Sequence, residues 1–284
     1  MVEIGLVLGG GGAKGAYEAG AWKALCNVGL NNHIRIYSGA SIGALNCAFI
    51  KLMDCDEFSD FWLKYNLEKI FVYGGVNYEE IIEIIVNLRK GGKITFEGLF
   101  LRDGLIKLFE KVNIGNLENM KNDFYVNVAN ISEIPEEMRL IKPALDWYDG
   151  RSTGKTEYIN LKNKDAEFIQ DMLLATSALP IIYPPVKIGE DYYIDGGIND
   201  NLPIQPLYQR GFRKIIAIST TRLNKHNIAR KFPLAEIMLI HPSRYLGNLF
   251  SGTLNFNKLK IKQTYTLGYN DALNVIKKSN LLNY

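Results

Sequence analysis

A serine in a tight glycine-rich turn is the first residue of this sequence that could carry chemistry. Ser41 lies in GASIG, residues 39–43, which has the G-x-S-x-G spacing of a nucleophile on a sharp strand-to-helix turn. Gly39 and Gly43 leave room for that turn, and the amino end of the following helix would place partial positive charge near a developing alkoxide. The spacing therefore predicts a nucleophilic serine that needs a base.

A second glycine-rich segment, GGGGAKG at residues 9–15, precedes the serine. A G-x-G-x-x-G pattern also marks dinucleotide sites, but that interpretation needs a carboxylate at the end of the second strand, where residues 37–39 read YSG. A purely structural tight turn is another alternative. We favour a third interpretation, in which the glycines free backbone N–H groups to point into a pocket where an oxyanion forms.

Three Asp-Gly pairs supply candidate bases for the serine. Asp103 is expected to cap the helix DGLIKLFEKV, and Asp149 to form the turn of a hairpin across residues 142–161. Asp195 instead follows the apolar strand YYI and precedes Gly196 and Gly197, which allow another backbone to approach closely. Asp195 is therefore the candidate base, with a plain turn aspartate as the alternative.

Short apolar strands alternate with helical patterns along the chain, which predicts an α/β fold with a parallel sheet. Strands are expected in EIGLVLGG, HIRIYSG, FYVNVAN, DYYIDGG and KIIAIST, with helices after the first two, at about 164–175 and from about 257. The last fifty residues otherwise read as loop. Between about 56 and 122 the pattern is helical, with one apolar face formed by Ile81, Ile84, Ile85 and Leu88. We expect a single domain over residues 1–284 that carries this helical insertion.

Composition narrows the class of protein. A net charge of +3 over 284 residues, without arginine-rich or lysine-rich tracts, argues against nucleic acid as a partner. The amino end lacks a signal-peptide pattern, and the uncharged runs near 36–50 and 172–186 are too short and too rich in glycine or proline to span a bilayer. The three cysteines, Cys26, Cys47 and Cys55, lack a C-x-x-C pairing. We expect them to be reduced and buried in a cytoplasmic protein.

Four blocks in order make the chain resemble the patatin-like phospholipases, lipid acyl hydrolases that use a Ser–Asp dyad without histidine. The blocks are GGGGAKGAYEAGAWKAL, GASIGALN, ATSALPIIYPPV and YIDGGINDNLPIQPL. The tail from Gly247 to Leu273 is similar to the end of small bacterial members. The resemblance covers most of the chain and implies a three-layer α/β sandwich with a mostly parallel central sheet. It also implies that the variable helical segment at about 56–122 shapes an acyl pocket.

The resemblance assigns roles to individual positions. Ser41 attacks the ester carbonyl, Asp195 takes its proton, and water then hydrolyses the acyl-serine. The N–H groups of Gly10, Gly11 and Gly12 hold the oxyanion. Lys14, where many members carry arginine, stabilises that loop or a nearby negative charge, and Gly15 completes the motif. The family requires neither metal nor cofactor, so the implied partner is a lipid or acyl-ester substrate.

Two rival functions and one membrane contact complete the expectations. His241 has the chain order of a Ser-Asp-His α/β-hydrolase, although a loop or core histidine is the plainer interpretation. A lipid-binding or interaction module on the same fold would lack turnover. Basic residues in RLNKHNIARK and KLKIK form either a solvated face or a surface for transient, peripheral docking on anionic lipid.

Overall fold

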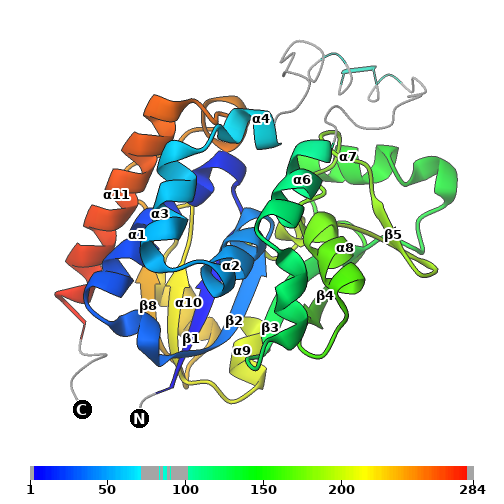
Figure 1. The fold of residues 1–284 in the computed structure, drawn as a ribbon. Helices are drawn as coiled ribbons and strands as arrows, with labels where there is room; N and C mark the ends of the chain where they lie inside the picture. The colour runs from blue at the N-terminus through cyan, green and yellow to red at the C-terminus, as the bar shows by residue number, and fades with distance from the viewer. Residues whose placement is uncertain (1–2, 72–82, 84–85, 88–89, 91–101, 280–284) are drawn as a thin grey trace.

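A computed structural model describes residues 3–71, 83, 86–87, 90 and 102–279 (Figure 1). The apolar helical face expected from Ile81, Ile84, Ile85 and Leu88 lies outside the described residues.

The centre of the molecule is a mixed sheet whose strands follow the order β5-β6-β3-β2-β1-β7-β8, with β4 paired to β3. The strands are β1 Ile4–Leu8, β2 Ile34–Ala40, β3 Phe124–Asn130, β4 Lys155–Asn160, β5 Val186–Ile188, β6 Asp191–Asp195, β7 Lys214–Ile218 and β8 Glu236–Ile240. The run β3-β2-β1-β7-β8 is parallel, whereas β4 and β6 pair antiparallel with β3. The predicted α/β class with a mostly parallel central sheet is confirmed.

Two strands, β2 and β6, share one edge of β3. β2 pairs with residues 124–127 of β3, β6 pairs with residues 128–130, and β4 occupies the other edge along residues 125–130. Because β2 is parallel and β6 antiparallel to β3, the two run toward each other. Their carboxyl ends meet, with Ala40 beside Asn127 and Asp195 beside Val128.

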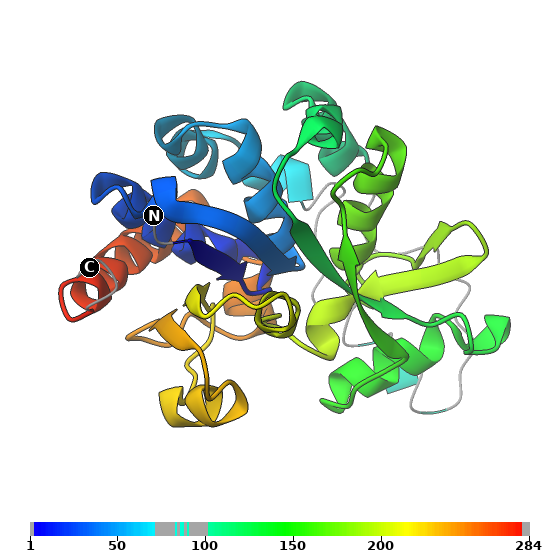
Figure 2. The ribbon, with the colours of Figure 1, turned by 90° about the horizontal axis from the view of Figure 1, so that it is seen from below.

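Helices cover both faces of this sheet (Figure 2). Strand alternation divides the core, since Leu6 and Leu8 pack into the larger apolar cluster and Val7 into a smaller one on the opposite face. The larger cluster includes side chains of α1 Gly15–Asn27, α2 Ile42–Leu52, α3 Cys55–Lys64, α4 Leu67–Phe71, α6 Asp103–Lys111, α8 Ala166–Thr176 and α11 Lys258–Ile276. The smaller cluster is covered by α9 Gln205–Gln209 and α10 Lys225–Lys231. The fold is thus the expected three-layer sandwich.

Three local predictions are wrong. The hairpin turning at Asp149 is instead helix α7, Ile141–Tyr148, because β4 finds its antiparallel partner in β3 and leaves the earlier segment free to bury Ala144. Asp149 is the residue that follows the helix. Asp103 is the first helical residue of α6 and makes no capping hydrogen bond, since Arg102 holds the cap position. The last fifty residues also contain β8 as well as loop and helix.

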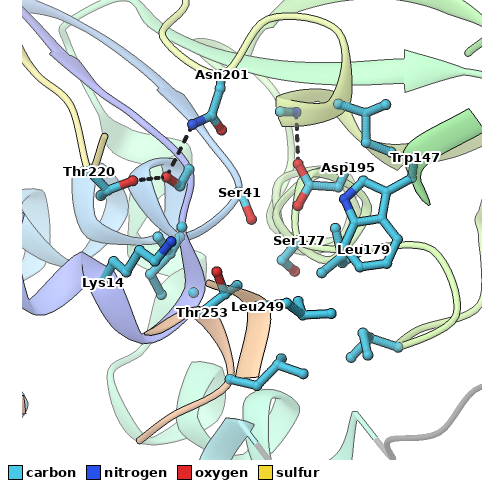
Figure 3. Close-up of a pocket in the computed structure, with 18 of the residues that line it drawn as sticks. Lys14, Ser41, Trp147, Ser177, Leu179, Asp195, Asn201, Thr220, Leu249 and Thr253 are labelled. Atoms are coloured by element: carbon cyan, nitrogen blue, oxygen red, sulfur yellow. Dashed lines mark hydrogen bonds between the residues drawn. The ribbon is translucent and has the colours of Figure 1, made fainter. Parts of the chain in front are cut away.

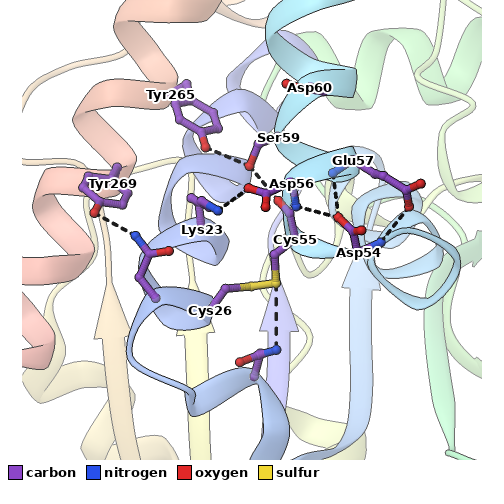
Figure 4. A network of polar contacts seen from close by, with 12 residues as sticks. Lys23, Cys26, Asp54, Cys55, Asp56, Glu57, Ser59, Asp60, Tyr265 and Tyr269 are labelled. Atoms are coloured by element: carbon purple, nitrogen blue, oxygen red, sulfur yellow. Dashed lines mark hydrogen bonds and ion pairs between the residues drawn. A yellow bond between two sulfur atoms is a disulfide. The ribbon is translucent and has the colours of Figure 1, made fainter.

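The cysteine prediction is also wrong for two of the three residues. Cys26 in the last turn of α1 and Cys55 at the start of α3 form a disulfide, with their Cα atoms 6.4 Å apart (Figure 4). An ion pair of 2.5 Å between Lys23 and Asp56 joins the same two helices. Cys47 is free and buried, as expected. A disulfide between two packed helices leaves no local signature in the sequence. Because two of the three cysteines are paired, the cysteines no longer support a cytoplasmic location.

Within the described ranges, none of the helices combines the length and the apolar character needed to cross a bilayer.

The disulfide should contribute measurably to stability. It closes a loop over a sequence separation of 29 residues, and loop-closure entropy for that size is worth about 3.6 kcal/mol. We expect reduction to lower the free energy of unfolding by about 2–4 kcal/mol, measured by urea unfolding with and without dithiothreitol. A Cys26→Ser variant should start at the lower value and show no further response to reductant. Equal midpoints for oxidised and reduced protein would contradict this expectation.

Candidate active site

Ser41 stands at the junction of β2 and α2 in a backbone conformation that few non-glycine residues adopt. Its φ is 53° and its ψ is −130°, a geometry that costs on the order of 1–3 kcal/mol. Hydrogen bonds hold it there: the N–H donates to Thr176 Oγ1 over 3.0 Å, and the carbonyl accepts from Ala44 N over 2.9 Å. Thr176 in turn donates to the Asn127 carbonyl over 2.6 Å. The serine thus has the strained turn that its spacing predicts, and it directly precedes the amino end of α2.

The two glycines around the serine permit close backbone contacts. A Cβ at Gly43 would overlap the carbonyl groups of Leu8 and Gly9, because α2 passes directly over the end of β1. A Cβ at Gly39 would lie 2.6 Å from the Cα of Ala44. The G-x-S-x-G spacing therefore reflects the need for the helix to fold back onto β1 and β2.

Asp195 is the last residue of β6 and is 3% exposed. Its Oδ1 accepts from the Gly197 N–H over 2.8 Å, and Gly196 sits so close to the Asn127 backbone that a Cβ would not fit. Figure 3 shows the carboxylate and the Ser41 hydroxyl facing each other in the cavity that both side chains line. The two side chains come together because β2 and β6 end head to head on β3.

Burial decides the protonation behaviour of Asp195. The loss of water raises its pKa to about 7, while hydrogen bonds from the Ser41 hydroxyl and the Gly197 N–H act in the opposite direction. The pKa of Asp195 therefore lies well above the value of 3.8 that an unperturbed aspartate has. An ionised Asp195 is thus a stronger base than an exposed aspartate.

The glycine loop lies beside Ser41, but the N–H groups of its three predicted donors differ in whether they are already hydrogen-bonded. The Gly10 N–H, which the sequence predicted to hold an oxyanion, already donates to the Asn201 carbonyl over 3.1 Å and is not a free donor in this structure. Gly11 and Gly12 line the cavity, and their N–H groups have no acceptor among the described residues. Gly12 has a φ of 56°, and a Cβ there would overlap the Thr253 carbonyl. The available donors are therefore those of Gly11 and Gly12.

The two remaining residues of that motif, Lys14 and Gly15, flank the loop. Lys14 lines the cavity, and burial lowers its pKa, as does the nearby Lys260. Within the described part of the chain, no acidic side chain forms an ion pair with it. Gly15 begins α1 and packs so tightly against Ile42 and Trp62 that a side chain would displace them. Lys14 thus contributes positive charge to the cavity, whereas Gly15 has a packing role.

The cavity that contains these groups has a volume of about 460 Å³ and two chemically different ends. Ser41, Asp195 and the glycine loop form its polar end. The other end is mainly apolar, and the side chains that line it include Phe71, Leu105, Leu179, Ile182, Leu249, Leu254 and Phe256. Phe71 and Phe256 stack with ring centroids 5.0 Å apart. The insertion expected at 56–122 therefore supplies part of an apolar wall beside the reactive groups.

None of the three histidines lines this cavity. His241 follows β8 and accepts a hydrogen bond at Nδ1 from the Leu223 N–H over 3.3 Å. Strands β1 and β7 separate β8 from β2, which places it about 14 Å away at ordinary strand spacing. His33 precedes β2 at the opposite end of that strand, and His226 lies in the exposed helix α10.

Sequence reasoning missed three polar residues of the site, Asn201, Thr220 and Thr176. Asn201 and Thr220 line the cavity and both donate to the Gly10 carbonyl, and Thr176 accepts the Ser41 N–H. Thr220 could have been found, because it follows the buried strand KIIAI as Ser41 follows its own strand. Asn201 and Thr176 carry no such signal, since their contacts join segments distant in the chain.

Comparisons with known proteins agree with this geometry. A family model described as patatin-like phospholipase matches residues 6–208, more than half of the chain. The lysophospholipase NTE1 of Candida albicans is 25% identical over 218 residues, which is 76% of this chain but 13% of that protein. The chain thus spans a small part of that relative. A probable lipid hydrolase 463L of Invertebrate iridescent virus 6 is 24% identical over 83% of this chain and 76% of its own length.

One solved structure supports the fold, and only the fold. VipD from Legionella pneumophila superposes with a TM-score of 0.58 at 15% identity, covering 98% of this chain and 67% of that one.

The buried carboxylate should make stability depend on pH in a defined direction. Since the folded pKa of Asp195 is raised from 3.8 to about 7, its contribution is fully favourable below pH 3.8 and is lost as pH rises toward 7. Asp195→Asn removes this cost, so we expect the variant to unfold at higher temperature than the wild type near pH 8. The gain should be at most about 4 kcal/mol and should vanish near pH 4. Thermal unfolding of both proteins at the two pH values measures it. A stability difference between variant and wild type that is the same at both pH values would show that the pKa of Asp195 is not raised in the folded protein.

Proposed function

Because the chain belongs to the patatin-like phospholipase family, we propose that it hydrolyses acyl esters of lipids with a dyad of Ser41 and Asp195. The observation that carries this proposal is the buried Asp195 carboxylate facing the Ser41 hydroxyl, next to two glycine N–H groups that have no acceptor among the described residues. A nucleophile, a base and oxyanion donors in one cavity are the groups that acyl transfer requires.

In the first half-reaction Ser41 Oγ attacks the ester carbonyl while its proton passes to the Asp195 carboxylate. The carbonyl oxygen becomes an oxyanion that accepts hydrogen bonds from Gly11 and Gly12, with the positive charge of Lys14 nearby. Collapse of the tetrahedral intermediate breaks the bond to the leaving alcohol, which takes the proton from Asp195. The product is an acyl-serine, and Asp195 is ionised again.

Water completes the cycle by attacking the acyl-serine. Asp195 accepts a proton from that water, and the oxyanion forms at the same two N–H groups. When the Ser41–acyl bond breaks, Asp195 returns the proton to Ser41 Oγ and the fatty acid leaves. A carboxylate with a pKa raised to about 7 can accept and return this proton near neutral pH.

The proposed substrate is an ester whose acyl chain lies in the apolar end of the cavity. The apolar wall offers Phe71, Leu105 and Phe256 to such a chain, whereas the head of the ester would lie toward Lys14. Several related proteins are named lysophospholipases, and another is named a probable lipid hydrolase. We therefore assign phospholipid or lysophospholipid acyl esters as the substrate class.

Two rival functions make different use of the same geometry. A Ser-Asp-His triad has little support, because His241 follows a strand three positions away from β2. A lipid-binding module without turnover would still bind an acyl chain in the apolar end. Reaction of the protein with a fluorophosphonate distinguishes that module from an enzyme, since covalent labelling requires an activated serine.

Substitution of the dyad tests the mechanism. Ser41→Ala and Asp195→Asn should each reduce kcat by three or more decades, since the first removes the nucleophile and the second cannot accept its proton. His241→Ala, alone or with His226→Ala, should keep most of the activity. In the wild type, kcat/KM should rise with pH through a midpoint near 7, where Asp195 ionises. Hydrolysis of a chromogenic acyl ester and mass spectrometry of the fluorophosphonate adduct on Ser41 measure these outcomes.

A loss of three decades in a folded His241→Ala protein would replace the dyad with a triad. No labelling of any serine in the wild type would remove the hydrolase proposal.

We also propose transient contact with anionic lipid at the start of α11. Lys258, Leu259 and Lys262 are exposed there, with Leu259 at 65%, and the helix begins two residues after Phe256 of the cavity wall. Lys258→Gln with Lys262→Gln should weaken binding to anionic vesicles about 30-fold, at about 1 kcal/mol per charge. Vesicle sedimentation at low and high salt measures this.

The matched control for this experiment is the pair Lys277→Gln and Lys278→Gln, two exposed lysines just beyond the other end of α11. Equal binding to neutral and anionic vesicles, or an equal loss in the control pair, would rule out electrostatic docking at the start of α11.

A further inference from the structure

The Gly10 carbonyl is held by two side chains from distant segments. Thr220, which is 2% exposed and follows β7, donates its hydroxyl to this oxygen, and Asn201 donates from Nδ2 over 3.3 Å. Figure 3 shows both side chains converging on the same oxygen. The Asn201 backbone carbonyl also accepts the Gly10 N–H over 3.1 Å. The peptide groups on both sides of the Gly10 Cα are thereby anchored.

The geometry of a peptide bond passes this restraint to Gly11. The carbonyl of Gly10 and the N–H of Gly11 belong to one planar trans peptide, so they point in opposite directions. A carbonyl directed toward Thr220 and Asn201 therefore turns the Gly11 N–H away from them. Ser41 lies directly beside this peptide, since a Cβ at Gly10 would be 3.0 Å from Ser41 Cβ. In Figure 3 the oxygen that accepts from Thr220 and Asn201 lies between Thr220 and Ser41. The Gly11 N–H is thus directed to the side where Ser41 attacks.

The glycine loop needs these hydrogen bonds because its own backbone does little to fix the orientation of its peptide groups. Glycine populates both signs of φ with almost equal ease, so a peptide between two glycines can rotate at low steric cost. Rotation of the Gly10–Gly11 peptide would remove the N–H from the cavity and present a carbonyl, which repels an oxyanion. A donor is most effective when it is fixed in place before the charge develops.

We infer that Thr220, supported by Asn201, is a positioning residue that holds the Gly11 N–H in the oxyanion hole. The inference rests on the proposed function, since an oxyanion forms only if Ser41 attacks a carbonyl. Thr220 acts through the Gly10 carbonyl and does not touch the reacting atoms. Its loss should affect the transition state, in which the oxyanion exists, more than the bound ester.

The first test compares Thr220→Val, which keeps the shape but removes the donor, with Thr220→Ser, which keeps the hydroxyl. Direct removal of an oxyanion donor costs about 10²–10³ in kcat, so misdirecting one should cost about tenfold or more. We expect Thr220→Val to lower kcat by that factor with KM changed less than about threefold. Thr220→Ser should restore most of the rate. The affinity for a trifluoromethyl ketone, which forms an oxyanion with the serine, should fall in parallel with kcat.

Two further variants keep the test independent of folding. Thr266→Val makes the same chemical change at an exposed position on α11, where the hydroxyl donates to the Lys262 carbonyl over 2.9 Å, and should leave kcat unchanged. Asn201→Ala removes the second donor but keeps the backbone carbonyl that binds Gly10, so a smaller loss confined to kcat is expected. If Thr220→Val proves unstable by thermal unfolding, Asn201→Ala decides alone.

The outcomes separate this inference from the proposed function. If the wild type is labelled at Ser41 by a fluorophosphonate and Thr220→Val turns over at the full rate, the inference is wrong. Equal losses in Thr220→Val and Thr220→Ser would also overturn it, because the hydroxyl would not be the cause. If the wild type neither labels at Ser41 nor hydrolyses esters, the proposed function itself fails, and this inference with it.

Discussion

The site depends on the way two strands share one edge of β3. β4 occupies the full length of the other edge, so β2 and β6 must divide the remaining one, and they run toward each other. Ser41 comes one residue after the end of β2, and Asp195 is the last residue of β6. The parallel strands β1 and β2 place the glycine loop and the serine at one edge of the sheet, where a carboxylate must face them. The antiparallel strand supplies that carboxylate.

This meeting point lies inside the molecule, which determines the chemistry of Asp195. Strand pairing and the close approach of Gly196 to the Asn127 backbone exclude water from the carboxylate. Burial therefore raises its pKa, at a cost to stability at neutral pH and with a gain in basicity. The strained backbone of Ser41 is a second local cost, and the Thr176 hydroxyl and the first turn of α2 offset part of it. The fold thus stabilises a buried Asp195 carboxylate and a strained Ser41 backbone, neither of which would be stable in an isolated segment of the chain.

The neighbouring parallel strands supply the remaining groups. β1 leads into the glycine loop, and β7, which pairs with β1, leads to Thr220, so the loop and its anchor follow adjacent strands. Glycine is required for the close packing, as the contact of Gly12 with Thr253 shows, but it also leaves the peptides free to rotate. Side-chain donors from elsewhere in the chain remove that freedom. The apolar half of the cavity comes from separate segments, which include α4 and α6.

The sequence by itself predicted the features that follow from local pattern. Alternating strands and helices indicated the α/β class. The G-x-S-x-G spacing pointed to Ser41, the run of glycines to the loop at residues 9–15, and the apolar strand YYI before it to Asp195. The tertiary structure decided what depends on contacts between distant segments. It replaced the hairpin at Asp149 with helix α7, because β4 pairs with β3. It joined Cys26 to Cys55, because α1 packs on α3. It paired the Gly10 N–H with the Asn201 carbonyl and the Gly10 carbonyl with Thr220, because hydrogen bonds of backbone groups depend on long-range contacts that the residue types do not record. Local residue types thus predict which groups are present, whereas long-range pairing determines which of them remain free to act.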